Sequence, residues 1–370
     1  MSSRLGLRYR GHTSGSVPNC ACHSRREVLA GIGAIGAAAA LCPAPASGQV
    51  ASPAVRTIDV HHHIYPPRYQ ADSYQQIAKD LGPRGASISA NWSPGSAIER
   101  MDRAGVATAI NSVTSPGVWF NDGEAGRARS RVCNEFGAQL MRDFPGRFGM
   151  FAAIPLPDTE GSLREIEYAF DVLKLDGVGL LSSYAGKLLG DPLFTPVFDE
   201  LNRRKAVVFV HPTMSCCGNV GPGIESTTIE FPTDTTRTIA SLLFGGAFAR
   251  YSDARFIFSH GGGVLVSIMS RIVGAAARLN PDERMAKLPK GPEYELQRQY
   301  YEMASIGLSP AGVAALRVLF PTSQLLYGSD EPFLSSAQLG GSLQKQGFSA
   351  ADLQAIQRDN VVHLLPRLQT

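Results

Sequence analysis

The sequence predicts an α/β fold in which eight strands alternate with helices in a (β/α)₈ TIM barrel. Two observations favour this fold. Short runs of β-branched and aromatic residues alternate with longer amphipathic segments from residue 56 onward, and most of the histidines stand where such a run ends. Eight such units fit within about 320 residues, which is within the range of sizes of such barrels. An open doubly wound sheet is the alternative.

The alternation places each element in turn. Strands are predicted at 56–62, 106–114, 147–154, 177–183, 206–211, 254–260, 299–305 and 324–328. Helices are predicted between them at 96–105, 123–143, 161–174, 195–205, 233–250, 264–279, 309–319 and 335–346, and Ser96 and Glu99 have the spacing of a capping box at the first of these. The polar stretch at about 68–95 is too long for a simple loop, so we interpret it as a small insertion after strand 1 that covers the barrel mouth.

Residues 1–46 have the pattern of an export signal. Arg25 and Arg26 precede an apolar run rich in glycine and alanine, Val28 to Leu41, and Ala44-Pro45-Ala46 follows as a small-x-small cleavage pattern. The run resembles a twin-arginine signal, and its ~14 residues are short of the ~20 that span a bilayer. We therefore expect cleavage after Ala46, a periplasmic protein without a stable membrane anchor, and a single barrel domain over 47–370. An N-terminal membrane anchor is the alternative.

Charge and cysteine content narrow the function classes. The chain has 35 Lys+Arg and 32 Asp+Glu, of which residues 1–46 hold five and one, so 30 basic and 31 acidic residues remain after cleavage. This balance excludes the basic footprint of a nucleic-acid-binding protein. Three cysteines remain, Cys133, Cys216 and Cys217, which are too few for a disulfide framework. A bridge between neighbouring Cys216 and Cys217 would be strained, so free thiols are the favoured interpretation.

Three consecutive histidines end the first strand, in "TIDVHHHIYPP". Side chains at i and i+2 of a strand share a face, so His61 and His63 point together and His62 points to the other side, toward the helices. Two imidazoles that enter the barrel from one strand end make half of a metal site.

Three more polar residues end later strands. His211 ends "AVVFVH", His260 ends "ARFIFSH", and Asp330 follows "QLLYGS". Active sites of such barrels are built at the carboxyl ends of the strands. Because every histidine after residue 46 except His363 lies at a strand end, these side chains are expected to meet in one site.

Four ordered motifs also carry a family resemblance. "IDVHHHIYPP", "VFVHPT", "DTTRTIASLLFGGAFARYSDARFIFSHGGG" and "LLYGSDEPF", within about 57–365, resemble the amidohydrolase-related family of metal-dependent decarboxylases. That family includes aminocarboxymuconate semialdehyde, 6-methylsalicylate and γ-resorcylate decarboxylases. The resemblance implies a barrel of the metal-dependent hydrolase type and non-oxidative decarboxylation of a small aromatic (hydroxybenzoate-type) or related unsaturated carboxylic acid.

The resemblance also implies roles for individual residues. His61, His63, His211 and Asp330 match the family's metal ligands, and His260 matches its acid/base histidine. Asp330, beside the metal, is in addition our candidate proton donor.

Two arginines are candidates for substrate binding. Arg271 matches an arginine that reaches the neighbouring subunit's site to hold a substrate carboxylate, which implies a homodimer or a dimer-based oligomer. A solvated charge on a helix face is the alternative for Arg271. Arg84 lies near the position of a second substrate arginine, although out of register with it.

The motifs depart from the family at two places. Glu331 stands where an aromatic residue commonly follows the strand 8 aspartate, and "HPTMSCCGN" lacks the tryptophan that follows the strand 5 histidine in the muconate enzymes. Both departures argue against aminocarboxymuconate as the substrate. The segments "DTTRTIASLLFGGAFARY" and "YYEMAS" resemble those of the hydroxybenzoate-type decarboxylases, which favours an aromatic carboxylate.

Three imidazoles and one carboxylate predict one divalent metal ion, Zn²⁺ first and Mn²⁺ as the alternative. Such a site can activate water or can bind a carboxylate and its ortho-hydroxyl group. Two other functions therefore stay open: a hydrolase of a lactone or amide, and a periplasmic metal-binding protein without catalysis. The glycines after His260 argue against the second, because small residues let a substrate approach the backbone.

Overall fold

A computed structural model describes residues 56–214 and 224–369 of the chain. The predictions on the export signal and on the Cys216–Cys217 pair concern residues outside these ranges. Within the described part, eight parallel strands form one sheet in the order β1-β2-β3-β4-β7-β8-β9-β10. They span Thr57–His63, Val106–Ser112, Phe148–Ala153, Gly177–Leu181, Val207–His211, Arg255–Phe258, Tyr300–Glu302 and Leu325–Leu326, and a short hairpin is formed by β5, Ser183–Tyr184, and β6, Lys187–Leu188. All eight predicted strands are confirmed.

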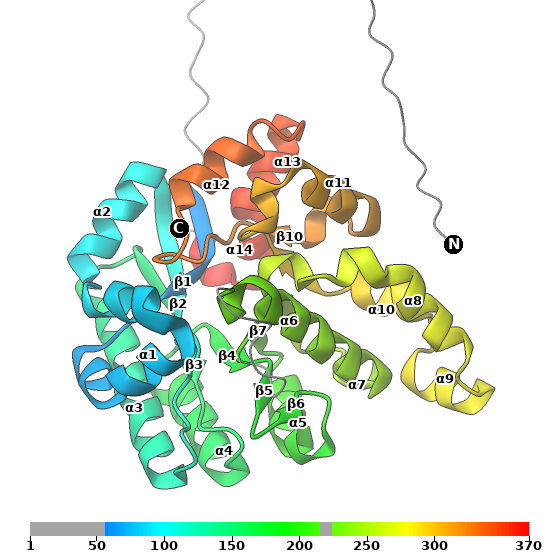
Figure 1. Ribbon diagram of the computed structural model, residues 1–370, viewed down its shortest axis with the longest axis horizontal. Helices are drawn as coiled ribbons and strands as arrows, with labels where there is room; N and C mark the ends of the chain where they lie inside the picture. Colours follow the sequence, from blue (N-terminus) through cyan, green and yellow to red (C-terminus); the bar gives the residue numbers. More distant parts are fainter. Residues whose placement is uncertain (1–55, 215–223, 370) are drawn as a thin grey trace, which may run out of the picture. The chain divides into compact units, whose positions relative to one another are not determined.

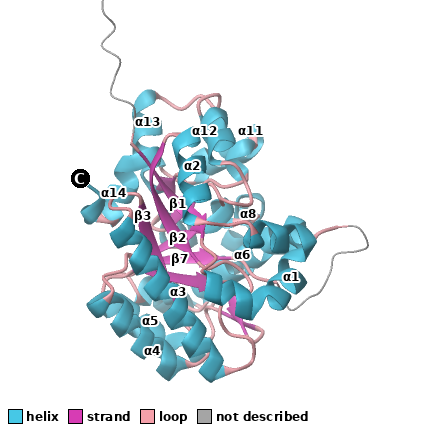
Figure 2. Cartoon of the chain, turned by 90° about the vertical axis from the view of Figure 1, so that its left-hand side faces the viewer, coloured by secondary structure: helices cyan, strands magenta, loops and turns pink. Residues whose placement is uncertain are grey.

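The sheet closes into a barrel between its first and last strands. The backbone N–H of Val60 donates to the carbonyl of Tyr327 at 3.0 Å, and that of Asp330 donates to the carbonyl of His61 at 2.8 Å. Figures 1 and 2 show the strands gathered at the centre with helices around them. The (β/α)₈ barrel is therefore confirmed, and the open doubly wound sheet is wrong.

Helices surround the strands. They are α1 Pro67–Ala90, α2 Pro94–Ala104, α3 Gly123–Asp143, α4 Thr159–Glu167, α5 Thr195–Arg203, α6 Ser226–Phe244, α7 Ala247–Arg250, α8 Leu265–Ala277, α9 Pro281–Lys287, α10 Pro292–Gln297, α11 Pro310–Leu319, α12 Ser336–Leu343, α13 Ala350–Gln354 and α14 Asn360–Leu364. Among the described residues, no helix has both the length and the apolar character that crossing a membrane requires.

The insertion after strand 1 is helical. Helix α1 fills most of it and kinks at Gly82, whose φ of 67° favours glycine, directly before Pro83. The capping box predicted at Ser96 and Glu99 is wrong. Helix α2 begins earlier because Ser93 caps it by accepting from the Ser96 N–H, and Pro94 occupies its first turn.

The barrel interior is filled by aliphatic and aromatic residues below the site. One buried cluster joins inward residues of the strands to the C-terminal segment: Ile58, Val60, Ile110, Phe151, Val207, Phe209, Ile257, Tyr300, Leu326, Val361, Leu365 and Leu368. The rings of Phe151 and Phe209 stack at 5.5 Å, and Phe209 contacts His61 above them. A packed interior leaves only the carboxyl ends of the strands for a binding site.

A bulge in β1 decides which histidines face inward. Val60 belongs to the interior cluster, so strict alternation would also turn His62 inward. The register of β1 against β2 instead slips between Asp59 and His62, which adds one residue to β1. His61 and His63 consequently point into the barrel.

Candidate active site

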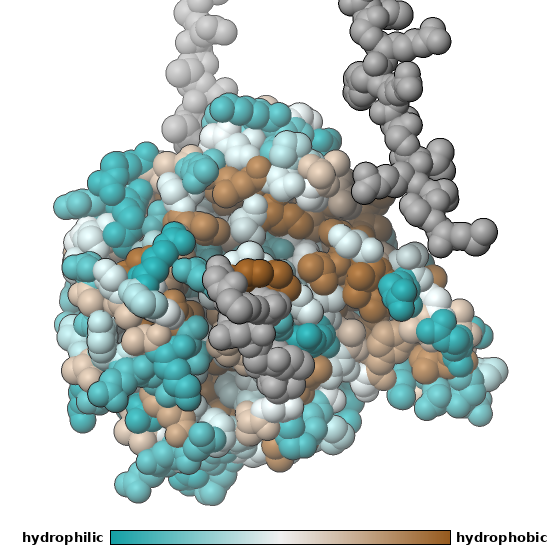
Figure 3. Space-filling view, in the orientation of Figure 1, coloured by the Kyte–Doolittle hydropathy of each residue, from teal (hydrophilic) through white to brown (hydrophobic). Residues whose placement is uncertain are grey.

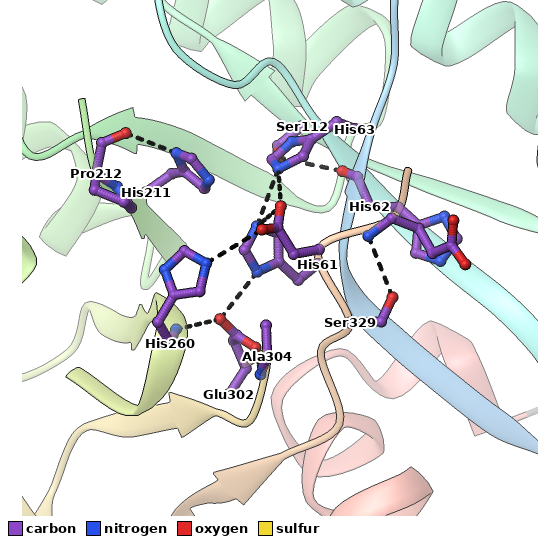
Figure 4. A network of polar contacts seen from close by, with 12 residues as sticks. His61, His62, His63, Ser112, His211, Pro212, His260, Glu302, Ala304 and Ser329 are labelled. Carbon is purple, nitrogen blue, oxygen red and sulfur yellow. Dashed lines mark hydrogen bonds and ion pairs between the residues drawn. The ribbon is translucent and has the colours of Figure 1, made fainter. Parts of the chain in front are cut away.

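His61, His63, His211 and His260 meet at the carboxyl end of the barrel (Figure 4). Asp330 lies among them, in contact with His63 and His260. His61 Nε2 lies 3.0 Å from His63 Nε2 and 3.3 Å from Asp330 Oδ1. One ligand atom from each of His61, His211, His260 and Asp330 lies within 4.8 Å of all the others. These atoms fit a divalent metal ion. This group of four contains His260 and leaves out His63, whose Nε2 lies 3.0 Å from both His61 Nε2 and Asp330 Oδ1. The predicted ligands therefore lie close together, and His260 lies with them.

Hydrogen bonds at Nδ1 orient two of the imidazoles. His61 Nδ1 lies 2.9 Å from Glu302 Oε1, and His211 Nδ1 lies 2.7 Å from the carbonyl oxygen of Pro212. A carboxylate and a carbonyl can only accept, so both rings carry their proton on Nδ1 and turn the Nε2 lone pair toward the centre. Metal-ligating histidines are commonly held in this way.

His63 is held similarly, whereas His260 is not. The Ser112 hydroxyl lies 3.4 Å from the carbonyl of His62, to which it donates, and 3.2 Å from His63 Nδ1, from which it then accepts. His260 Nδ1 is buried and has no hydrogen-bond partner among the described residues. No hydrogen bond at Nδ1 therefore fixes the tautomer of His260, which distinguishes it from the other three imidazoles of the site.

Each carboxylate oxygen of Asp330 contacts a different histidine. Oδ1 lies 3.0 Å from His63 Nε2, and Oδ2 lies 3.3 Å from His260 Nε2. Burial by itself raises the pKa of Asp330, but the neighbouring imidazoles of His61, His260 and His63 bring that pKa well below its usual range. Burial lowers the pKa of His260, yet the hydrogen bond to Asp330 raises the pKa overall. Asp330 and His260 thus form a pair that can hold a proton.

Glu302 on β9 is a site residue that the sequence analysis missed. Its Oε1 accepts from His61 Nδ1 and, at 2.5 Å, from the backbone N–H of His260, and its Oε2 accepts from the Ala304 N–H at 2.6 Å. Burial raises the pKa of Glu302 to about 8, although the charge of His260 and the backbone N–H groups of Ala304 and His260 lower it. An acidic residue inside a buried strand was the available signal, because such a group needs partners.

His62 lies outside this cluster, as predicted. Its Nε2 lies 3.2 Å from Asp59 Oδ2, and both side chains are buried. The other oxygen of Asp59 accepts from the N–H groups of His61 and Ser329. Asp59 therefore connects β1 to the segment that carries Asp330.

A cavity opens above the cluster. His211, His260 and Asp330 line its base, and its walls are mainly apolar and aromatic: Leu81, Phe231, Pro232, Phe333 and Leu334, with Arg84, Thr114, Thr227, Thr228 and Ser305 among the polar groups. The Phe231 ring lies 5.9 Å from that of His211, and the Phe333 ring 5.8 Å from that of His63. The cavity can therefore hold a flat apolar ring beside the metal-binding atoms.

The sequence model of the amidohydrolase family matches residues 58–367. The chain belongs to the amidohydrolase family. It is 33% identical to decarboxylase yanB of Aspergillus niger over 84% of this chain and 88% of that protein. It is 30% identical to the 6-methylsalicylic acid decarboxylase acuB of Aspergillus aculeatus, over 84% of this chain and 96% of that one. The structure of a 5-carboxyvanillate decarboxylase from Novosphingobium aromaticivorans, complexed with manganese and a nitrobenzoic acid, has a TM-score of 0.75 at 20% identity, over 84% and 96% of the two chains.

The two candidate arginines of this amidohydrolase lie in different places. Arg84 is in α1 just after the kink, lines the cavity, and donates to the carbonyl of Phe333 at 3.3 Å. Arg271 is exposed on α8 and is not among the described residues that line its own cavity. Arg84 can therefore meet a ligand in its own subunit, whereas Arg271 remains a prediction that needs a partner subunit.

Glu331 is buried and structural in this amidohydrolase. Its Oε2 lies 3.0 Å from Arg100 Nε on α2, and its Oε1 accepts from the N–H of Ser336 on α12. An aromatic side chain nonetheless stands beside the metal-binding atoms, because Phe333 supplies it two residues later.

The glycines after His260 serve the backbone turn, and the interpretation that they admit a substrate stays a prediction. Gly261, Gly262 and Gly263 all have positive φ, and none is among the described residues that line the cavity. A Cβ on Gly263 would lie 1.9 Å from the carbonyl oxygen of Pro232 on α6. Glycine is needed because the chain passes this close to the helix.

Proposed function

We propose that this amidohydrolase is a metal-dependent, non-oxidative decarboxylase of a small aromatic, hydroxybenzoate-type carboxylic acid. The observation that carries the proposal is a cluster of imidazole and carboxylate ligand atoms at the base of a cavity with aromatic walls, Phe231 and Phe333. The similarity to yanB and to a 6-methylsalicylic acid decarboxylase, at 33% and 30% identity, supports the reaction and the substrate class.

The proposed ligands are His61, His63, His211 and Asp330. The three histidines are those whose Nδ1 atoms have a hydrogen-bonding partner, which leaves each Nε2 for the metal. Zn²⁺ suits this set, and Mn²⁺ is the alternative because the related Novosphingobium structure contains it. A bound divalent ion supplies positive charge to the carboxylate and hydroxyl oxygens of an aromatic acid.

The remaining chemistry falls to His260 and Asp330. Asp330 Oδ2 and His260 Nε2, 3.3 Å apart, hold a proton and deliver it to the ring carbon that bears the carboxylate. The bond from this carbon to the carboxylate then breaks, its electron pair restores the aromatic ring, and CO₂ leaves. One proton from solvent returns the pair to its starting state. The apolar walls keep other water away from the ring.

A carboxylate substrate also calls for positive charge beside the metal. Arg84 is placed to supply it from the cavity wall. Arg271 supplies it to the neighbouring subunit in a homodimer or dimer-based oligomer. Helix α8, which carries Arg271, also has the partly exposed apolar residues Val266, Ile268 and Val273, and apolar side chains gather over α6 and α8 in Figure 3. Such a surface suits contact with a second copy.

Export of the folded, metal-loaded chain by the twin-arginine pathway completes the proposal. Its support is the sequence of residues 1–46, with Arg25 and Arg26 before the apolar run. A folded protein can acquire its metal before it leaves the cytoplasm.

An isotope experiment tests the reaction. Purified protein with bound metal is incubated in D₂O with 2-hydroxybenzoates, including a methylsalicylate, and CO₂ release and product mass are followed. We expect one deuterium on the ring carbon that lost CO₂. Lactones and aryl amides serve as parallel substrates. A product with solvent oxygen from these, and no CO₂ from any benzoate, would mean that the chain is a hydrolase.

A further inference from the structure

Ser305 lies in an unusual backbone conformation at the end of β9. Its φ is 53° and its ψ is −53°, and the Ile306 N–H donates to the carbonyl of Ala304 at 2.5 Å across it. This is a γ-turn with positive φ, which is strained for a residue with a side chain. Glycine would adopt the same turn more easily.

Ser305 lies at the cavity, beside the two residues proposed for proton transfer. Seven described residues other than glycine have positive φ, and three of them, His260, Ser305 and Asp330, line the catalytic cavity. These three follow the neighbouring strands β8, β9 and β10. Two of them are the proposed acid/base pair, so the turn at Ser305 lies between reacting groups.

The carboxylate of Glu302, which orients His61, also holds the turn at Ser305. Glu302 Oε2 accepts from the Ala304 N–H, and the carbonyl of Ser305 accepts from the Leu308 N–H at 3.0 Å. The Ser305 side chain is exposed to the cavity, and no hydrogen bond from its hydroxyl to another described residue is found. An outward hydroxyl on a braced turn is free to bind a ligand.

We propose that Ser305 positions the substrate by donating a hydrogen bond from its hydroxyl to an oxygen of the bound aromatic acid. The proposal rests on the proposed function for the identity of that acid. The oxygen belongs either to the carboxylate or to the ring hydroxyl, and these share the chemistry of an anionic or phenolic acceptor.

Two variants separate the hydroxyl from the backbone. Ser305→Ala removes the hydroxyl and keeps the strain, whereas Ser305→Gly removes both. Ser323→Ala, an exposed serine at the opposite end of the barrel, is the matched control. Dissociation constants for salicylate and benzoate are measured by calorimetry on metal-loaded protein, with melting temperatures alongside. Salicylate has the ring hydroxyl and benzoate lacks it.

We expect both Ser305 variants to bind salicylate about 5- to 30-fold more weakly than the wild type, which is the usual effect of one lost hydrogen bond. Loss for both ligands assigns the carboxylate, and loss for salicylate alone assigns the ring hydroxyl. Ser305→Gly should melt at or above the wild-type temperature, because glycine adopts this turn without strain. If Ser305→Ala fails to fold, Ser305→Gly still tests the loss of the hydroxyl.

Two results would overturn the proposal: wild-type affinity for both ligands in both variants, or weakened binding in only one variant, which would trace the effect to the backbone. Binding is measured without turnover, so these outcomes are distinct from failure of the proposed function, which is absence of CO₂ release by the wild type.

Discussion

Replacing Glu302 with glutamine tests whether one buried carboxylate holds the metal site together. The carboxylate accepts from His61 Nδ1 and the His260 N–H at one oxygen and from the Ala304 N–H at the other. Glutamine has nearly the same shape but only one acceptor oxygen. If its NH₂ group takes the place of Oε1, it faces the N–H groups of His61 and His260; if it takes the place of Oε2, it faces the N–H of Ala304.

The size of the effect follows from these contacts. A hydrogen bond to a charged acceptor contributes about 1.5–3 kcal/mol, and one to two such bonds are lost at a pH above the Glu302 pKa of about 8, where its carboxylate is ionised. We expect Glu302→Gln to lower the free energy of unfolding of the metal-free protein by about 2–4 kcal/mol. Metal affinity should fall by about 10- to 100-fold, because His61 loses the charged partner that fixes its ring.

Denaturant unfolding gives the stability, and competition with a fluorescent chelator gives the metal affinity. Glu165→Gln is the matched control, because Glu165 is also buried and accepts from Arg131 at 2.9 Å and Asn134 at 2.8 Å, away from the site. The control should lose comparable stability and keep its metal affinity. If Glu302→Gln binds metal within about threefold of the wild type, Glu302 has no part in positioning the ligands.

Three further predictions follow from the same site and from the N-terminal segment. The protein should hold one divalent ion per chain, and elemental analysis should find that His211→Ala loses most of this metal while His62→Ala keeps it. The reason is that His211 faces the cluster, whereas His62 faces Asp59. Full metal content in His211→Ala would show that His211 is not a ligand. His260→Ala should keep the metal but lose about 10²- to 10⁴-fold in kcat, and loss of metal instead would make His260 a ligand. Changing Arg25 and Arg26 together to Lys should leave the protein in the cytoplasm, whereas the wild type should be exported with an N-terminus near Ser47. Cell fractionation and mass spectrometry measure both, and normal export of the variant would contradict the twin-arginine signal.

Much of the barrel could be predicted because its signals are local. Alternation of side chains within each strand and periodicity within each helix depend on neighbouring residues only. The strand ends were less accurate. The strands predicted at 254–260 and 299–305 end at Phe258 and Glu302, because His260 and Ser305 turn the chain with positive φ. Those turns depend on contacts with other strands, which a local pattern does not contain.

The partners that orient the site were also beyond local patterns. Glu302 is 241 residues from His61, and Ser112 is 49 residues from His63. Glu302 is conspicuous as an acidic residue in a buried strand, but only the closed barrel reveals which imidazole it meets, and the same holds for Ser112. The metal-binding residues themselves were predictable, because histidines are few and stand at strand ends.

The sequence by itself determined that His61 and His63 share a face and that His62 does not, because the side-chain period of a strand is two. Only the tertiary structure shows why the expected face, that of His61 and His63, lies inside the barrel. Strict alternation from Val60 would have turned His62 inward, and the bulge before His62 reverses this. Asp59 holds that irregular segment by accepting from the N–H groups of His61 and Ser329, and Ser329 lies 270 residues away. The pairing of β1 with the end of the last strand therefore sets the orientation of the metal site, and that contact exists only once the barrel has closed.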